Sequence, residues 1–232
     1  MEQPQHTGRI SFINYEKQFA TIDYQHNSKQ KAVNFKTTSG KGKKPHQYRL
    51  GDIVRFTLRL SDRGDKMTAD DVHYIHNPGL EVLLQKAGTE NRFSGYLKVV
   101  DGRYFVKEVD SYILFPLQLS AWEMPPADTA ENAAISFRLV NIDRPNSIRA
   151  ELFSHQYIPE YRMAQRHFKD KTPVEAWVSR VSPHAVYLEL FTASMHAKLP
   201  LDKTRTSPLK PGDSVQVMIT WLSPDKIAVE LV

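Results

Sequence analysis

A β-hairpin pattern recurs along the chain and limits the folds that the chain can adopt. In residues 215–232, hydrophobic and polar residues alternate on both sides of a Ser-Pro-Asp turn, which gives each strand one apolar face. Residues 135–153 repeat the alternation around Asp-Arg-Pro-Asn-Ser, and IRAELF stands there where IAVELV stands in the later copy. A third copy is predicted at residues 54–72. Self-similarity of this kind indicates repeated β units.

Each hairpin closes a block that begins with three further short strands. In the middle block these are FSGYLKVV, RYFVKEV and YILFPL, and in the last block VEAWVSRV, VYLEL and AKLPL. Similar segments also precede the first and last hairpins. Leu50-Gly51-Asp52 precedes the first, and residues 209–213, which begin with Leu and end in Gly-Asp, precede the last. Five short strands in a block of about 60–75 residues are typical of a five-stranded OB barrel.

The sequence therefore predicts an all-β protein of three tandem small five-stranded OB-type barrels joined by short helical linkers. The predicted domains are residues 1–76, 90–157 and 171–232. In the first linker, residues 77–88, Asn77 is the expected helix cap and Gly88 the expected stop. Residues 158–170 predict a second, amphipathic or irregular helix.

Composition argues against several classes of protein. The chain has no cysteine, which excludes disulfides, thiolate zinc sites and a cysteine nucleophile, and which fits a reducing compartment. Its longest apolar runs, such as residues 112–117, are far shorter than the roughly 20 residues of a membrane span. Residues 1–9 lack the apolar core of a signal peptide. We expect a soluble bacterial protein of the cytoplasm, with no membrane partner.

The positive charge is concentrated in the first third of the chain. Residues 1–78 carry 13 Lys and Arg against 8 Asp and Glu, a difference of +5 that equals the net charge of the whole chain. No acid interrupts residues 24–51, whose basic residues are Lys29, Lys31, Lys36, Lys41, Lys43, Lys44 and Arg49. Such a patch is what a phosphate backbone requires, although a solvated loop kept soluble by lysines would have the same composition.

The first block carries a more specific signal, because residues 8–22 resemble the opening segment of bacterial cold-shock proteins. That family begins its first strand with a glycine and continues with Phe-Asn-x-Glu-Lys-Gly-Phe-Gly-Phe-Ile. The positions that match this pattern are Asn14, Glu16, Lys17, Phe19 and Ile22. Residues 31–35, KAVNF, take the place of the family's second RNA-binding motif, and residues 50–54 and 69–72 match its fourth and closing strands. The resemblance covers residues 8–75.

The cold-shock resemblance implies that aromatic side chains on the first three strands stack on the bases of an unpaired strand. Phe12 falls where the family has Trp, Phe19 and Phe35 keep phenylalanines of its two motifs, and Lys17 also matches. The further lysines expected to contact phosphates are Lys29, Lys31, Lys41, Lys43 and Lys44. Other aromatic or histidine positions of the family hold Ile13, Thr21, Ala32 and Asn34, so the stacking surface is thinner than usual. Alternatively, the three phenylalanines are ordinary core residues.

The last block, residues 172–232, is similar to the RNA-binding domain repeated in ribosomal protein S-one. Its segments VSPHAVYLEL, AKLPLD and PGDSVQV stand in the places of that family's motifs. Strict alternation points Val174, Ala176 and Val178 inward. The side chains expected to line one outward RNA-binding face are Trp177, Arg180, Tyr187 and Lys198. Alternatively, Trp177 packs against a neighbouring barrel.

The middle block and the remaining motifs give no catalytic or metal site. The middle block is near neutral and offers Tyr96, Lys98, Phe105 and Lys107 at outward positions, and we expect it to serve spacing or protein contact. Residues 37–44 are not a phosphate-binding loop, because no Ser or Thr follows the Gly-Lys pair. His73 and His76 lack acidic or thiolate partners, and no nucleophile–base pair is evident. We therefore expect no metal, no cofactor and no enzymatic activity.

Two functional hypotheses remain open. The first is non-catalytic binding of single-stranded RNA, or of single-stranded DNA, by aromatic stacking and lysine–phosphate contacts. The second is an adaptor whose depleted stacking faces dock on the ribosome or on RNA polymerase, mainly through protein contacts.

Overall fold

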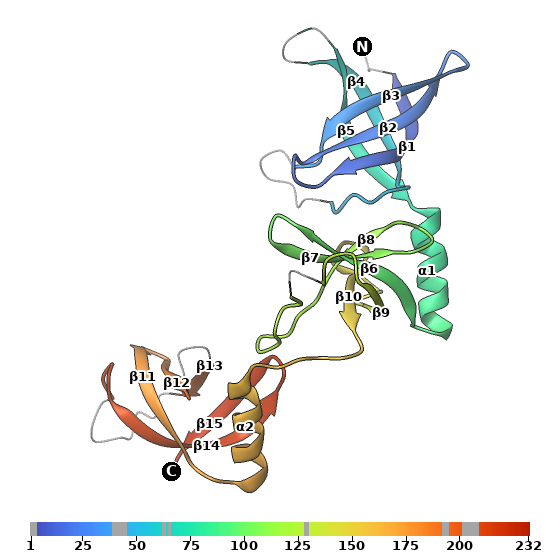
Figure 1. The fold of residues 1–232 in the computed structure, drawn as a ribbon. Coiled ribbons are helices and arrows are strands. Elements are labelled where there is room, and N and C mark those ends of the chain that lie inside the picture. Colours follow the sequence, from blue (N-terminus) through green and yellow to red (C-terminus); the bar gives the residue numbers. More distant parts are fainter. Residues whose placement is uncertain are drawn as a thin grey trace. The chain divides into compact units, whose positions relative to one another are not determined.

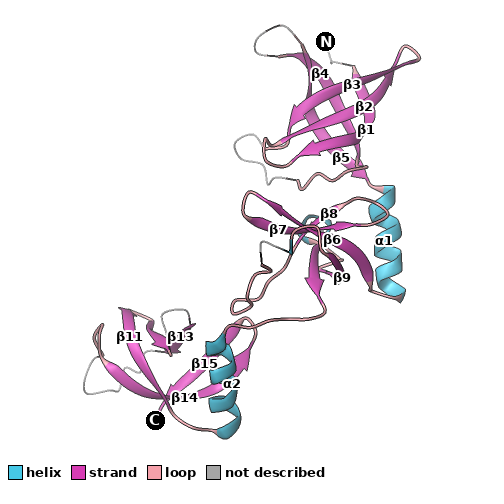
Figure 2. Ribbon diagram, viewed as in Figure 1, coloured by secondary structure: helices cyan, strands magenta, loops and turns pink. Residues whose placement is uncertain are grey.

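In the computed structural model of this chain, the residues described are 4–38, 46–61, 64, 66–127, 130–191, 195–200 and 209–232. Strands predominate, and the helices α1 and α2 lie between successive sheets along the chain (Figures 1 and 2). No helix among these residues is long and apolar enough to cross a membrane.

The first sheet is a closed five-stranded barrel. Its strands are β1 (Gln5–Asn14), β2 (Phe19–His26), β3 (Lys29–Lys36), β4 (Ile53–Leu60) and β5 (Met67–His76). They pair in the order β1-β2-β3-β5-β4, which is the OB-type arrangement. Alternate residues of each strand point into the barrel, so that Ile10, Ile22, Val33, Val54 and Phe56 form the centre of its core.

The middle sheet repeats this strand order. Its strands are β6 (Phe93–Val100), β7 (Arg103–Glu108), β8 (Leu114–Pro116), β9 (Ala134–Val140) and β10 (Arg149–Leu152). They form a five-stranded sheet in the order β10-β9-β6-β7-β8, and a parallel bridge between Leu117 and Ala150 joins its two edges. The 3-10 turn at Pro145–Ser147 connects β9 to β10.

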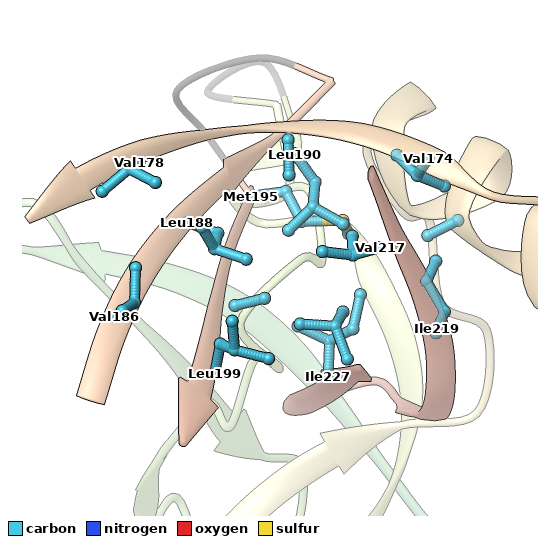
Figure 3. Close-up of a cluster of buried hydrophobic side chains, with 14 of the residues drawn as sticks. Val174, Val178, Val186, Leu188, Leu190, Met195, Leu199, Val217, Ile219 and Ile227 are labelled. Atoms are coloured by element: carbon cyan, nitrogen blue, oxygen red, sulfur yellow. The ribbon is translucent and has the colours of Figure 1, made fainter. Parts of the chain in front are cut away.

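The last sheet is a second closed barrel. Its strands are β11 (Val174–Ser182), β12 (Ala185–Leu190), β13 (Met195–Pro200), β14 (Ser214–Ser223) and β15 (Lys226–Leu231), in the order β11-β12-β13-β15-β14. Figure 3 shows side chains from all five strands meeting inside it, among them Val178, Leu188 and Ile227. The predicted all-β fold of three OB-type sheets is thus confirmed. The middle sheet is more open than the two closed barrels.

The helices follow the predicted linkers. Helix α1 (Pro78–Thr89) is capped by Asn77, whose side-chain oxygen accepts a 2.9 Å hydrogen bond from the Leu80 amide. The expected stop at Gly88 is wrong, because the helix continues through it to Thr89. Helix α2 (Pro159–Asp170) adds Tyr161 and Ala164 to the core of the last barrel.

The shared Gly-Asp motif closes both barrels in the same way, which confirms the internal repeat. In the first barrel the Ile10 backbone forms two 2.8 Å hydrogen bonds with residues 51–52, and in the last barrel Val178 forms the same two bonds with residues 212–213. The glycine of each motif has a positive φ, 84° and 95° respectively, which favours glycine over other residues.

The chain divides into two compact units. The first contains residues 1–118 and 127–153, and the second contains residues 119–126 and 154–232. The first barrel and the middle sheet thus share a unit, whereas the segment around Trp122 belongs with the last barrel, where its ring stacks on Tyr161 at 5.5 Å. The three-domain division at 1–76, 90–157 and 171–232 remains a prediction.

Arg49 corrects the expected basic patch, because it is buried. Its amide donates to the Asp52 carboxylate at 2.8 Å, and its guanidinium donates to the Pro145 carbonyl oxygen at 2.6 Å. Asn77 donates to the second oxygen of the same carboxylate at 2.7 Å. Burial lowers the pKa of the Arg49 guanidinium, and the negative charge of Asp52 opposes that shift. Arg49 therefore holds the first unit together and is not available to a phosphate.

We expect Asp52→Ala to destabilise the first unit by about 2–4 kcal/mol, because it leaves the buried Arg49 amide and the buried Asn77 side chain without the carboxylate that accepts from both. Asp213→Ala removes the equivalent carboxylate of the last barrel, a half-buried group that accepts a 2.7 Å bond from the Lys210 amide, and should cost about 1 kcal/mol. The measurement is denaturant unfolding followed by circular dichroism and by tryptophan fluorescence. Because all three tryptophans lie in the second unit, Asp52→Ala should leave the fluorescence transition in place. A shift in both signals would contradict this assignment.

Candidate nucleic-acid interface

The outer surface of the first barrel presents two neighbouring aromatic rings. Phe12 on β1 is 50% exposed, Phe19 on β2 is half-buried, and their ring centroids lie 5.9 Å apart. A β-bulge between Ile10 and Phe12 interrupts the alternation of β1, so that Phe12 faces outward although Ile10, two residues earlier, faces the core. The structure therefore brings together two of the three predicted stacking residues.

Phe35 is not one of them, and this corrects the predicted site. Its side chain is 6% exposed, lies in the barrel core and meets the Tyr48 ring edge-on at 5.0 Å. The reason is the alternation of β3, in which Val33 and Phe35 point inward while Asn34 and Lys36 point outward. Phe35 stabilises the barrel and has no free face for a base.

The outward positions beside the two rings are polar. Thr21 on β2 lies directly opposite Phe12 and opposite Asn34 on β3, and its hydroxyl donates a 2.8 Å hydrogen bond to the Asn34 side-chain oxygen. Lys36 lies opposite Phe19. The surface thus consists of two rings, one polar pair and a flanking lysine.

Among the described residues, the predicted lysines of the first barrel lie in two separate places. Lys17 is exposed in the turn after β1, where its amide donates a 2.8 Å bond to the Asn14 side chain, close to Phe19 in sequence. Lys29 and Lys31 are exposed at the opposite end of β3 from Lys36. Lys41, Lys43 and Lys44 lie outside the described residues. Lys36, which the cold-shock resemblance did not single out, pairs across the strands with Phe19.

The last barrel brings its four predicted residues onto one outer face. Arg180, Tyr187 and Lys198 lie opposite one another on β11, β12 and β13, and the Arg180 guanidinium carbon is 4.2 Å from the centroid of the Tyr187 ring. Trp177 is 53% exposed on the same strand as Arg180. A bulge between Val178 and Arg180 places Arg180 on the Trp177 face, whereas unbroken alternation would have turned it inward.

The same row of side chains continues to a tryptophan that the sequence did not reveal. Lys198 pairs with Ala228 on β15, and Ala228 pairs with Trp221 on β14, whose side chain is 59% exposed. Alternation along residues 215–219 predicts that Trp221 faces the core with Val217 and Ile219. A bulge between Ile219 and Trp221 reverses this, and no local residue pattern marks its position.

Comparisons with known proteins identify no family. No family model matches the chain, and no curated protein matches it. One similar solved structure is a multidomain protein with nucleic acid binding domains from Streptococcus pneumoniae TIGR4, with 13% identity and a TM-score of 0.23 over 98% of this chain and 73% of that one. Another is Drosophila Unr CSD456, with 15% identity and a TM-score of 0.29 over 100% of this chain and 98% of that one. Likenesses with TM-scores this low assign neither a fold nor a function.

Acrylamide quenching of tryptophan fluorescence checks this geometry. We expect strong quenching of variants that keep only Trp177 or only Trp221, because both rings are more than half exposed. The variant that keeps only Trp122, made by Trp177→Phe and Trp221→Phe, is the control and should be quenched weakly because that ring is buried. If the Trp221 variant is as protected as the Trp122 variant, the bulge in β14 is misplaced.

Proposed function

We propose that this protein binds single-stranded RNA without catalysis, through the outer faces of its two closed barrels. The observation that carries the proposal is the cross-strand row Arg180, Tyr187 and Lys198, in which a half-buried ring lies between two cations. The first barrel supplies a second site, in which the rings of Phe12 and Phe19 are flanked by Lys36.

The physical basis is the sum of stacking and charge. Each base that stacks on an exposed ring contributes about 1–3 kcal/mol, with little dependence on base identity. A guanidinium over an aromatic ring, as at Arg180 and Tyr187, is held by a cation–π attraction and offers its own plane to a base. Lysines at the flanks neutralise phosphates, which makes the affinity depend on salt. Two weak sites on one chain raise the overall affinity if one strand reaches both.

Membership of particular families is part of this proposal. The resemblance of residues 8–75 to cold-shock proteins and of residues 172–232 to the S-one domain supports binding at these faces. A preference for RNA over DNA requires a contact with the 2′-hydroxyl group. Parallel titrations with RNA and DNA oligonucleotides of one sequence decide between them.

The adaptor hypothesis has one structural observation in its favour. In the first barrel, Thr21 and Asn34 occupy positions at which the cold-shock family has an aromatic residue or a histidine, and their side chains are bonded to each other. Because Phe35 lies in the core, only Phe12 and Phe19 of the three predicted stacking rings remain on the outer face of this barrel. If the wild type does not bind oligonucleotides but co-sediments with ribosomes or RNA polymerase, the adaptor function replaces the RNA-binding one.

Removing both rings of the first barrel should weaken binding of a uridine oligonucleotide by about 2–6 kcal/mol if both stack. The variant is Phe12→Ala with Phe19→Ala, and fluorescence anisotropy measures the affinity. The control is Leu60→Ala with Met67→Ala, a pair of exposed apolar residues that face each other on β4 and β5 of the same barrel. Equal losses in the two double variants would show that apolar area, and not the stacking surface, is responsible.

Neutralising the cations of the last barrel should reduce the salt dependence of binding. Each phosphate contact contributes about 0.7 to the slope of log affinity against log salt for a single strand. We therefore expect Arg180→Gln with Lys198→Gln to lower the slope by about 1.4. Lys169→Gln with Lys171→Gln removes the same charge from exposed positions at the end of α2 and serves as the control. An unchanged slope in the first variant argues against phosphate contacts at this face.

A further inference from the structure

The middle sheet and the last barrel share one register, which allows their surfaces to be compared position by position. Phe93 pairs with Phe137 as Val174 pairs with Val217, so the first strands β6 and β11 start at the same place. Gly95 and Ala176, two residues further along, are likewise equivalent. Each first strand then pairs with the second strand of its own sheet, β7 or β12, in the same order.

This register makes three surface residues of the middle sheet equivalent to three predicted binding residues of the last barrel. Tyr96, the residue after Gly95, stands where Trp177 stands. Lys98 pairs with Phe105 as Arg180 pairs with Tyr187. Both surfaces therefore carry an aromatic ring on the first strand, then a cation on that strand, and an aromatic ring beside this cation on the second strand.

The spacing along the chain conceals this equivalence. Tyr96 and Lys98 are two residues apart, whereas Trp177 and Arg180 are three apart. The bulge between Val178 and Arg180 accounts for the extra residue, because β6 and β7 pair without interruption from Gly95 to Val100. A comparison of the two sequences in simple alternation would place Arg180 on the wrong side of its strand.

The surroundings of these residues favour an anionic strand. Lys107 pairs with Tyr96, at the position where the last barrel has Glu189, and its ammonium group lies 4.7 Å from the Tyr112 ring. The carboxylate of Glu108, the next residue, is buried and accepts hydrogen bonds from the amide and hydroxyl of Ser111. Two lysines thus face outward beside the ring of Tyr96 while the nearest carboxylate on β7 faces inward.

The accessible ring of the middle sheet is Tyr96, which is 43% exposed. Phe105 is half-buried, and the ring of Tyr15 from the same compact unit lies 6.1 Å from it. Lys98 donates a hydrogen bond to the Asn132 side chain, which holds its ammonium group at this surface. A base can therefore stack on Tyr96, whereas Phe105, which pairs across the strands with Lys98, is less accessible.

From this we infer that the middle sheet is a third contact site for the same single-stranded RNA, at which one base stacks on Tyr96 while Lys98 and Lys107 bind the adjoining phosphates. The inference rests on the proposed function. It extends that function to the middle sheet, whose near-neutral charge had indicated spacing or protein contact. The net charge of the middle sheet is a poor guide, because an RNA strand interacts with the charges near its binding site and not with the total.

The test compares two double variants of the full-length protein. Tyr96→Ala with Lys98→Ala removes the proposed site. Phe153→Ala with Arg92→Ala removes another aromatic–cation pair of the same unit, 5.1 Å apart, near the opposite end of β6. The probe is a 20-residue oligouridine, and anisotropy gives its affinity. The loss of one stacked base predicts weakening by about 5- to 150-fold for the first variant, and little change for the second.

Crosslinking gives an independent readout. The same oligonucleotide carrying 5-iodouridine should form a photo-crosslink to Tyr96 that mass spectrometry locates. If the wild type binds, but Tyr96→Ala with Lys98→Ala behaves as the control does and Tyr96 is not crosslinked, this inference is overturned while the proposed function stands. If the wild type does not bind oligouridine at all, the proposed function fails and this inference fails with it.

Discussion

Both closed barrels depend on a β-bulge in their first strand. A sheet of only five strands closes when its strands bend sharply, and an extra residue in β1 and in β11 provides that bend. The bulge also reverses the side-chain alternation partway along the strand. Residues before it and after it therefore obey opposite rules, and this is why Ile10 is in the core while Phe12 is on the surface. The composition of the outer face follows from this single irregularity.

The Gly-Asp segment before the fourth strand is the second feature that closes each barrel, and we call it the corner. Each barrel returns to its first strand through a glycine with positive φ, and the backbone there bonds to the residue just before the bulge. Bulge and corner are thus in contact in both barrels. In the first barrel the aspartate of the corner also binds Asn77 and opposes the loss of charge at Arg49, so that the same residue ties the barrel to helix α1.

The candidate site was predictable to the extent that a linear pattern specifies it. Trp177, Arg180, Tyr187 and Lys198 were assigned to one face, and the structure brings them onto one. Phe35 was assigned to the surface on the strength of a family motif, but the pairing of β3 turns it inward. Trp221 was overlooked because a bulge with no sequence signature turns it outward. In each case the error lies in the direction of a side chain and not in the type of secondary structure.

The strands, their hairpins, the Asn77 helix cap and the repeated closing motif could be predicted from the sequence, because alternation and turn residues act over a few neighbouring positions. The exposure of particular rings, the lysines beside them and the burial of Arg49 became visible in the folded chain. Those outcomes depend on register and bulges, which are set by pairing between strands far apart in the chain. The equivalence of Tyr96 with Trp177 belongs to the second group, since it appears only when residues are aligned by their partners across the sheet.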